Sequence, residues 1–193
     1  MTIPSVRTRF FAAFTLALLA LTGCTESRAP ENASFNEADL KFVEQMIPHH
    51  QQAVQLADLA ETRAEDEEVR SIAMDISFIQ AIEVEELQGW LLDWGISHGT
   101  DDHDDHGDMA GMLTDEELQS LDAASGTDFD LLFSQLMVKH HEGAIDAARS
   151  VLNDGKSADV KVFAESVIET QTAELEELRS IIARLSPATD EGE

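Results

Sequence analysis

Apolar residues return every three or four positions in long stretches of this chain, which is the spacing of one face of an α-helix. The first pair of stretches runs over 42–60 and 69–94, and a second pair follows after residue 127. Short polar segments at 62–66 and 153–157 divide each pair, and Gly155 and Ser157 supply stop and start signals. The pattern predicts two helical hairpins, whose four apolar stripes can be buried together in an all-α four-helix bundle.

The second hairpin repeats the first at a constant offset of 91 residues, without insertion. The matching pairs include Asp39/Asp130, Phe42/Phe133, Met46/Met137, His49/His140, His50/His141, Gln80/Gln171 and Glu83/Glu174. A gapless match indicates a duplicated unit. We expect a bundle domain over 36–186, with hairpins at 36–96 and 127–186 and a long crossover at 97–126. A capping box at Thr114 predicts a short helix inside the crossover, and Pro187 ends the last helix, leaving 187–193 as a tail.

Pro48 lies inside the first predicted helix, and the repeat has Lys139 at the same place. A proline there frees the carbonyl of Glu44 from the helical hydrogen-bond pattern. Two interpretations follow. Pro48 produces a kink beside the histidine pair, which we favour, or it begins a new helical segment.

Polar residues occupy the apolar stripes at corresponding places in both repeats. Met46, His49 and His50 share one helix face at spacings of three and four. Counting 1.5 Å per residue from the turn places His49 level with Gln80, and Met46 level with Glu83. Unpaired burial of such groups costs a few kcal/mol each. The sequence therefore predicts a polar, metal-competent cavity in the bundle, formed by Met46, His49, His50, Gln80, Glu83, Met137, His140, His141, Gln171 and Glu174. Ordinary core histidines are the alternative, and His50 and His141 could face the edge of the bundle.

Thioether and imidazole ligands without thiolate favour copper, particularly Cu(I). The Glu-x-x-His motif of di-iron bundles does not occur in the sequence. Zinc and iron remain alternatives. A second, weaker candidate metal site lies in the crossover, where the residues are His98, His103, His106, Met109 and Met112. A solvated acidic linker explains that segment equally well.

The N-terminus has the features of an export signal. Arg7 and Arg9 precede a short apolar run over 10–21, which is typical of a signal peptide rather than a membrane span. The run continues into "LTGC" at 21–24, which resembles a bacterial lipobox. We expect a signal peptide over 1–23, a lipid on Cys24, a polar tether over 24–35, and a protein anchored on the extracytoplasmic side of a bacterial membrane.

The chain is strongly acidic, with 39 Asp and Glu against 12 Lys and Arg and a net charge of −27. Loss of Arg7 and Arg9 with the signal segment makes this −29. Such a surface repels nucleic acid and anionic lipid headgroups. We therefore expect no nucleic-acid partner and contact with the membrane only through the lipid. Cys24 is the single cysteine, so a lipidated chain has no disulfide or thiolate metal site.

The segments "FVEQMIPHHQQAVQLA" and "FSQLMVKHHEGAIDAA", each followed by a helix with "Q..E..EL", resemble the domain of unknown function 305 family. The resemblance covers roughly 36–186. It implies a ferritin-like bundle in exported bacterial proteins, some of which bind copper through Met and His. By position it implies Met46, His49, His50, Met137, His140 and His141 as ligands. The resemblance implies methionine at the positions of Leu56 and Ala147 and again near Leu87 and Leu178, which this chain lacks, so Cu(II) and Zn(II) stay open beside Cu(I).

These observations predict a lipid-anchored protein that buffers or sequesters copper and is not an enzyme. A helical interaction module with a purely structural polar layer is one alternative. A ferritin-like di-metal oxidase is the less favoured one.

Overall fold

The computed structural model describes residues 28–96 and 109–187. Its helices are α1 (Glu37–Arg63), α2 (Glu67–Asp93), α3 (Asp115–Ala123), α4 (Gly126–Asp154) and α5 (Ala158–Leu185). The predicted signal segment, Cys24, and the histidines His98, His103 and His106 lie outside the described residues. Within the described ranges every regular element is a helix, so the predicted all-α class is confirmed.

Side-chain caps explain where the helices begin. Asn36 and Asp39 form a capping box at the start of α1, and Thr114 and Glu117 form one at the start of α3. Ser157 caps α5 by accepting a hydrogen bond from the Val160 N–H. Each cap satisfies backbone donors that the first turn of a helix leaves free. The short helix predicted from the capping box at Thr114 is therefore confirmed.

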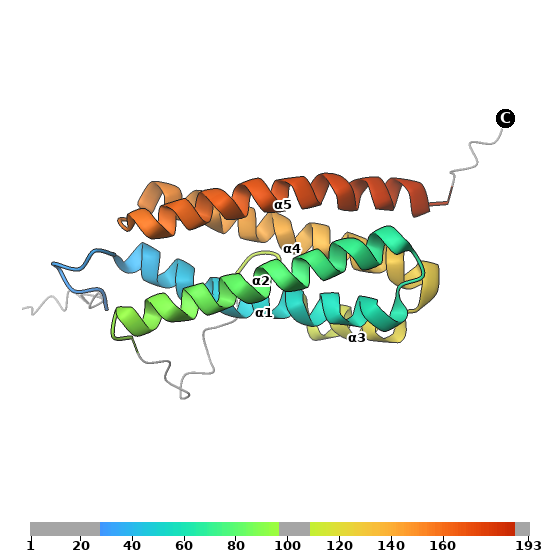
Figure 1. Cartoon of the computed structure of the whole chain (residues 1–193), viewed down its shortest axis with the longest axis horizontal. Helices are drawn as coiled ribbons and strands as arrows, with labels where there is room; N and C mark the ends of the chain where they lie inside the picture. The colour runs from blue at the N-terminus through green and yellow to red at the C-terminus, as the bar shows by residue number, and fades with distance from the viewer. Residues whose placement is uncertain (1–27, 97–108, 188–193) are drawn as a thin grey trace, which may run out of the picture.

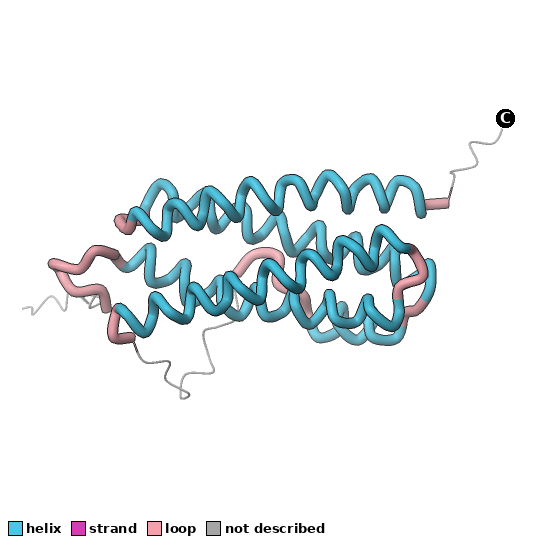
Figure 2. The backbone as a smooth tube through the Cα atoms, viewed as in Figure 1, coloured by secondary structure: helices cyan, strands magenta, loops and turns pink. Residues whose placement is uncertain are grey.

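The four long helices lie along one axis as two antiparallel hairpins, with α3 beside one end (Figure 1). Within the hairpins α1 packs on α2 and α4 packs on α5, while α1 and α4 form the main contact between the hairpins. The loops at the bundle ends are short, and one further loop, over 109–114, crosses the middle of the bundle (Figure 2). This arrangement is the four-helix bundle of two hairpins that the repeat predicts.

The core consists of two apolar clusters at opposite ends of the bundle. One cluster contains side chains from the first half of α1 and the first half of α5, among them Met46 and Phe163. The other takes the second half of α1 together with the first half of α4, and includes Leu56 and Met137. The buried histidines and glutamines lie between the two clusters along every long helix. A polar layer therefore divides the core at mid-height.

Two buried aspartates join the hairpins reciprocally. Asp39 on α1 accepts hydrogen bonds from the backbone N–H groups of Lys156 and Ser157 at 2.8 and 3.0 Å, in the turn before α5. Asp130 on α4 accepts from the N–H groups of Glu65 and Asp66 at 3.1 and 2.9 Å, in the turn before α2. The two sets of residues correspond under the 91-residue offset. We call them the aspartate clasps.

Close packing at one clasp accounts for Gly155. This glycine has a negative φ of −72°, so it is not needed for a left-handed turn. A Cβ at this position would instead overlap Asp39 Oδ1 and lie 2.6 Å from the Val151 carbonyl oxygen. In this copy the Asp39 carboxylate approaches the turn so closely that a Cβ would displace it, whereas the matching position of the other clasp is Ala64.

Residues 28–35, which the sequence assigns to a tether, are attached to the bundle. Arg28 makes two hydrogen bonds with the Glu44 carboxylate, at 2.8 and 3.0 Å. Phe35 is buried and stacks on Trp94 with ring centroids 4.0 Å apart. This segment is therefore part of the folded unit.

Helix α1 is continuous through Pro48. The interpretation of Pro48 as the start of a new helical segment is therefore wrong. The helix tolerates the missing N–H because the apolar face of α1 is buried on both sides of the proline.

The clasps predict a specific stability loss. Asp130→Ala leaves the Glu65 and Asp66 N–H groups at the start of α2 without their acceptor, and should lower the free energy of unfolding by about 1–3 kcal/mol. Urea denaturation followed by circular dichroism measures this difference. Asp128→Ala, an exposed change two residues away in the same helix, should have little effect. Equal losses in the two variants would contradict the role assigned to Asp130.

Candidate metal centre

The centre of the polar layer is a pair of histidines from the two repeats. His49 on α1 and His140 on α4 are fully buried. Their rings lie face to face, with centroids 3.7 Å apart and planes inclined by 34°. The sequence predicted these two side chains at one level of the bundle, and the structure brings them into contact.

Neither ring has its polar atoms satisfied. Among the described residues, neither Nδ1 nor Nε2 of His49 and His140 makes a hydrogen bond of good geometry, although the Ala110 backbone lies near the His49 ring and the His49 backbone near the His140 ring. Burial, helped by the nearby His50 and His141 and opposed in part by the Ala110 backbone, lowers the pKa of His49 to about 3. Burial, followed by His49, also lowers the pKa of His140 well below its ordinary value. Both imidazoles are therefore neutral at physiological pH, with lone pairs available to a ligand.

The neighbouring histidines each approach a glutamate of their own hairpin. His50 Nε2 lies 2.9 Å from Glu83 Oε2, and His141 Nε2 lies 2.7 Å from Glu174 Oε2. Both histidines are fully buried, so the alternative that they face the edge of the bundle is wrong. A carboxylate at Nε2 favours the tautomer with the proton on that atom, which leaves a lone pair on Nδ1. Among the described residues this Nδ1 atom has no partner in either histidine.

The glutamines complete the layer. Gln80 and Gln171 are buried. Within the described part of the chain neither the oxygen nor the nitrogen of the Gln80 side chain has a partner, and the oxygen of Gln171 has none. An unsatisfied buried amide costs about 1–3 kcal/mol, so a group that bonded to these amides would stabilise the layer.

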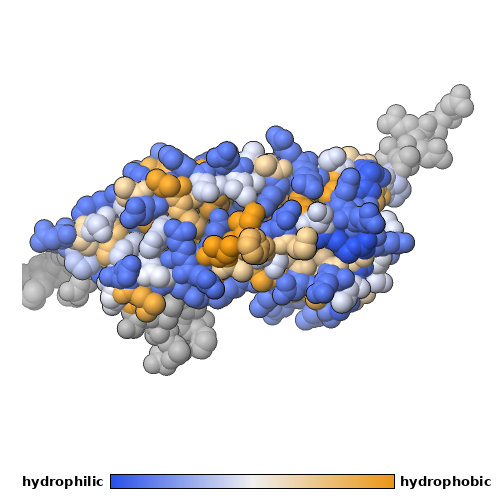
Figure 3. All heavy atoms as spheres, in the orientation of Figure 1, coloured by the Kyte–Doolittle hydropathy of each residue, from blue (hydrophilic) through white to orange (hydrophobic). Residues whose placement is uncertain are grey.

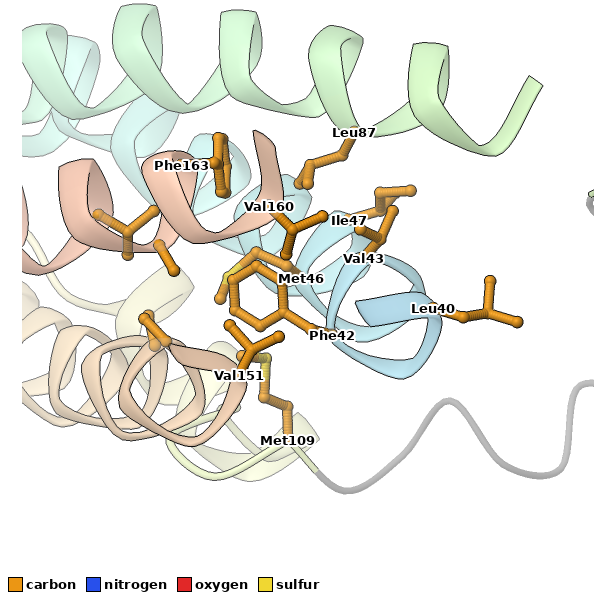
Figure 4. Close-up of a cluster of buried hydrophobic side chains, with 14 of the residues drawn as sticks. Leu40, Phe42, Val43, Met46, Ile47, Leu87, Met109, Val151, Val160 and Phe163 are labelled. Atoms are coloured by element: carbon orange, nitrogen blue, oxygen red, sulfur yellow. The ribbon is translucent and has the colours of Figure 1, made fainter. Parts of the chain in front are cut away.

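The methionines lie on either side of the layer. Met46 is fully buried in the cluster with Phe42, Val160 and Phe163 (Figure 4). Met137 is fully buried in the opposite cluster, with Phe129 and Phe133. The sequence placed Met46 level with Glu83. In the structure the main neighbour of the Glu83 carboxylate is His50.

A strap from the crossover, residues 109–113, covers the layer. Gln52 on α1 holds it by two hydrogen bonds, donating to the Leu113 carbonyl at 3.2 Å and accepting from the Leu113 N–H at 2.8 Å. Gly111 has a φ of +88°, and a Cβ on it would lie 2.9 Å from the His140 carbonyl oxygen. A Cβ on Gly143 would overlap the Ala110 carbonyl. The strap therefore touches α4 backbone to backbone.

Gln52 and Gly143 were missed by sequence reasoning, although one signal marks them. They occupy the same position of the repeat, immediately before the matching alanines Ala53 and Ala144. One copy uses this position to bind the strap and the other to make room for it.

Two of the five crossover candidates can be located. Met109 is buried beside Val151 in the cluster that contains Met46 (Figure 4), and Met112 is half-buried against it. Both methionines pack the strap onto the core. The separate loop site predicted for the crossover rests otherwise on histidines outside the described residues.

The imidazole nitrogens of the layer are atoms that commonly bind metal ions, although the side chains do not form a complete metal site. Within 28–96 and 109–187, no group of three or more His, Cys, Asp or Glu side chains is arranged to hold a metal ion. The available donors are neutral imidazole nitrogens, which suit copper and zinc. His49 and His140 are a matched pair of such donors, and His50 and His141 offer one nitrogen each.

The buried histidines predict acid sensitivity of the metal-free protein. An unfolded histidine takes up a proton below about pH 6.5, whereas folded His49 stays neutral to about pH 3. The unfolded state therefore binds more protons, and stability should fall as the pH drops through this interval, by about 1.4 kcal/mol per pH unit for each such histidine. Urea denaturation at pH 7, 6 and 5 measures the slope. His49→Leu with His140→Leu should flatten it, and parallel curves for parent and variant would contradict the assignment.

Comparison with known proteins identifies the family. No curated protein sequence matches the chain. A DUF305 protein from Streptomyces coelicolor, named as a secreted protein, is 30% identical with a TM-score of 0.70, and the match covers 77% of this chain and 93% of that one. A DUF305 fragment from Deinococcus radiodurans is 28% identical with a TM-score of 0.69, over 76% and 96% of the two chains. CopM in its Cu(I)-bound form is 25% identical with a TM-score of 0.64, over 77% and 98%. The family profile described as "Domain of unknown function (DUF305)" matches residues 39–182, and this chain belongs to that family.

Proposed function

We propose that this protein binds copper outside the cytoplasm through the imidazoles of its central layer, and that it buffers or sequesters the metal while anchored by a lipid on Cys24. The observation that carries the proposal is the contact between His49 and His140. Two neutral, fully buried rings, 3.7 Å apart, have no hydrogen-bond partner for any ring nitrogen among the described residues.

A purely structural role explains this arrangement poorly. Leaving buried polar groups without partners destabilises a fold by about 1–3 kcal/mol for each group. Apolar residues of similar size would fill the same space without that cost. The presence of this histidine in both repeats therefore favours a ligand that binds the free ring nitrogens.

The flanking histidines support the same function. Metal-bound histidines commonly hold a carboxylate on the nitrogen that does not face the metal, which fixes the tautomer. His141 with Glu174 has this relation through a hydrogen bond of 2.7 Å, and His50 Nε2 lies 2.9 Å from Glu83 Oε2 without hydrogen-bond geometry. We assign His49 and His140 as the principal ligands, and His50 and His141 as further ligands through Nδ1.

Similarity to CopM favours copper over other metals, and so do the imidazole and thioether groups of this chain. Solved structures of CopM, 25% identical to this chain, contain Cu(I) or silver. Silver and Cu(I) are soft ions that accept imidazole and thioether ligands. Met46 and Met137, buried on either side of the histidine layer, are the thioethers nearest to it in the sequence.

The copper proposal predicts binding that depends on the two central histidines. In an anaerobic competition titration, the chain from Thr25 onward should take up at least one equivalent of Cu(I), and His49→Leu with His140→Leu should reduce the affinity by about a hundredfold or more. Helical content should persist in the variant, because leucine fills the space without an unsatisfied nitrogen.

Two controls make the titration decisive. Cu(II) should quench the fluorescence of Trp90, which lies 5.5 Å from Phe163, itself 6.4 Å from the His50 ring. Replacing the exposed Lys139 beside the pair by Gln should leave the affinity unchanged. Unaltered stoichiometry and affinity in the double leucine variant would remove the copper assignment, and tighter binding of Zn(II) than of copper in the parent would replace it by zinc.

Export and lipidation belong to the same proposal. The lipobox at 21–24 supports them, as does the similarity to a DUF305 protein named as secreted. None of the helices in the described residues has the length and apolar character of a membrane span.

Lipidation has a direct test in a bacterial host. The full chain should incorporate an alkyne-labelled fatty acid and sediment with membranes. Cys24→Ser should abolish both the label and the sedimentation, while Ser34→Ala, in the same region, should preserve them. Membrane sedimentation of Cys24→Ser without label would contradict the lipid anchor.

A further inference from the structure

The outer face of α2 carries an exposed apolar ridge. Met74, Phe78 and Ile82 stand four residues apart and are 67%, 68% and 51% exposed. Side chains at this spacing lie one above the other on a helix. We call these three residues the α2 ridge. Figure 3 shows hydrophobic surface across the middle of the face that α2 presents to the viewer.

The repeat shows that the fold does not require this ridge. The positions on α5 that correspond to Met74, Phe78 and Ile82 are Glu165, Glu169 and Ala173. These three are also exposed, in the same environment of a duplicated hairpin. The α2 ridge is therefore a local property of α2 that the matching positions of α5 lack. Contiguous surfaces of this kind usually mark an interaction site.

A groove lies next to the ridge. It has a volume of about 600 Å³ and runs between α1 and α2. Its lining residues include Ala57, Asp58 and Glu61 from α1, and Glu67, Arg70, Met74 and Phe78 from α2. Met74 and Phe78 therefore belong both to the ridge and to the groove, so the ridge forms the apolar part of the groove wall.

The charge of the groove is negative. Asp58, Glu61 and Glu67 contribute carboxylates to its lining. Arg70 is its only lining cation, and its guanidinium donates hydrogen bonds to the carbonyls of Ala64 and Glu65 at 2.7 and 3.0 Å. Asp58 accepts a hydrogen bond from the Ser77 hydroxyl at 3.1 Å, and none of the three carboxylates has an ion pair with Arg70 among the described residues.

This charge decides between the candidate occupants. A second copy of the chain, with a net charge of −27, would bring carboxylates against carboxylates, which is unfavourable. Anionic lipid headgroups would be repelled in the same way. A segment with basic residues beside an apolar stripe complements both the ridge and the acidic lining.

We propose that the groove between α1 and α2, together with the α2 ridge, docks a basic amphipathic helix of a partner protein. The ridge spans two helical turns, about 12 Å at 1.5 Å per residue. Apolar residues at i, i+4 and i+7 of a docked helix would pack beside Met74 and Phe78. Lysine or arginine residues on its flanks would face Asp58, Glu61 and Glu67. The proposal is independent of metal binding.

The test uses a synthetic helical peptide of about 18 residues with a leucine stripe flanked by lysines, added to the chain from Thr25 onward. Methyl resonances of the methionines should be followed by NMR. The Met74 methyl should shift and saturate, while those of the buried Met46 and Met137 should not. Met74→Glu with Phe78→Glu, which copies Glu165 and Glu169 of the repeat, should weaken binding by about tenfold or more, measured by the fluorescence anisotropy of a labelled peptide because this variant lacks the Met74 methyl.

A matched variant separates the ridge from charge in general. Leu92→Glu with Val162→Glu adds the same two charges at positions that are 77% and 66% exposed, and should change the affinity less than threefold. Equal losses in both variants, or binding that survives Met74→Glu with Phe78→Glu, would overturn the docking site. Equally tight binding of a peptide with glutamate in place of lysine would overturn the charge argument. A dimer of the parent chain in sedimentation velocity that Met74→Glu with Phe78→Glu dissolves would assign the ridge to a second copy instead.

Discussion

The position of one hairpin along the other depends on the two aspartate clasps. Asp39 binds the turn of the second hairpin and Asp130 binds the turn of the first, through two backbone N–H groups each. Apolar stripes alone allow helices to slide, because a hydrophobic contact has no direction. Hydrogen bonds from a buried carboxylate to particular backbone donors do have a direction and a length. Each central histidine comes ten residues after the aspartate of its own repeat. The clasps therefore also determine which level of α4 lies opposite His49.

This register matters because the polar layer is costly in the metal-free state. Burial holds His49 and His140 neutral, with pKa values well below the ordinary range, and their nitrogens have no partners among the described residues. Apolar clusters above and below the layer supply the stability that it lacks. The strap over 109–113 closes one side, held by Gln52 and seated on Gly143. The bundle can thus keep imidazole nitrogens without hydrogen-bond partners in its centre, because the rest of the core is well packed.

Much of this could be predicted from the sequence, for identifiable reasons. Helical periodicity and the capping boxes predict the helices, and the 91-residue offset predicts two equivalent hairpins. The same periodicity places His49 and His140 on buried faces. It does not give the rotation of each helix about its axis, so the approach of His50 to Glu83 was not foreseen. Asp39 and Asp130 were visible as repeated residues, but their role depends on turns that lie far away in the chain. The strap was missed because its contacts require two glycines whose importance is steric.

The two copies agree and differ in an informative pattern. Residues that match under the offset, such as the clasp aspartates and the layer histidines, serve functions that both halves share. Three differences fall at special places: Gln52 against Gly143 at the strap, Pro48 against Lys139 beside the histidines, and Phe78 against Glu169 on the outer face. A duplicated fold supplies its own control, since the other copy shows what the same environment tolerates. Departures from the repeat that expose apolar surface or remove a side chain entirely are not explained by packing within one hairpin. They indicate instead where the molecule receives something that breaks its twofold symmetry: its own crossover at Gly143, and a partner at Phe78.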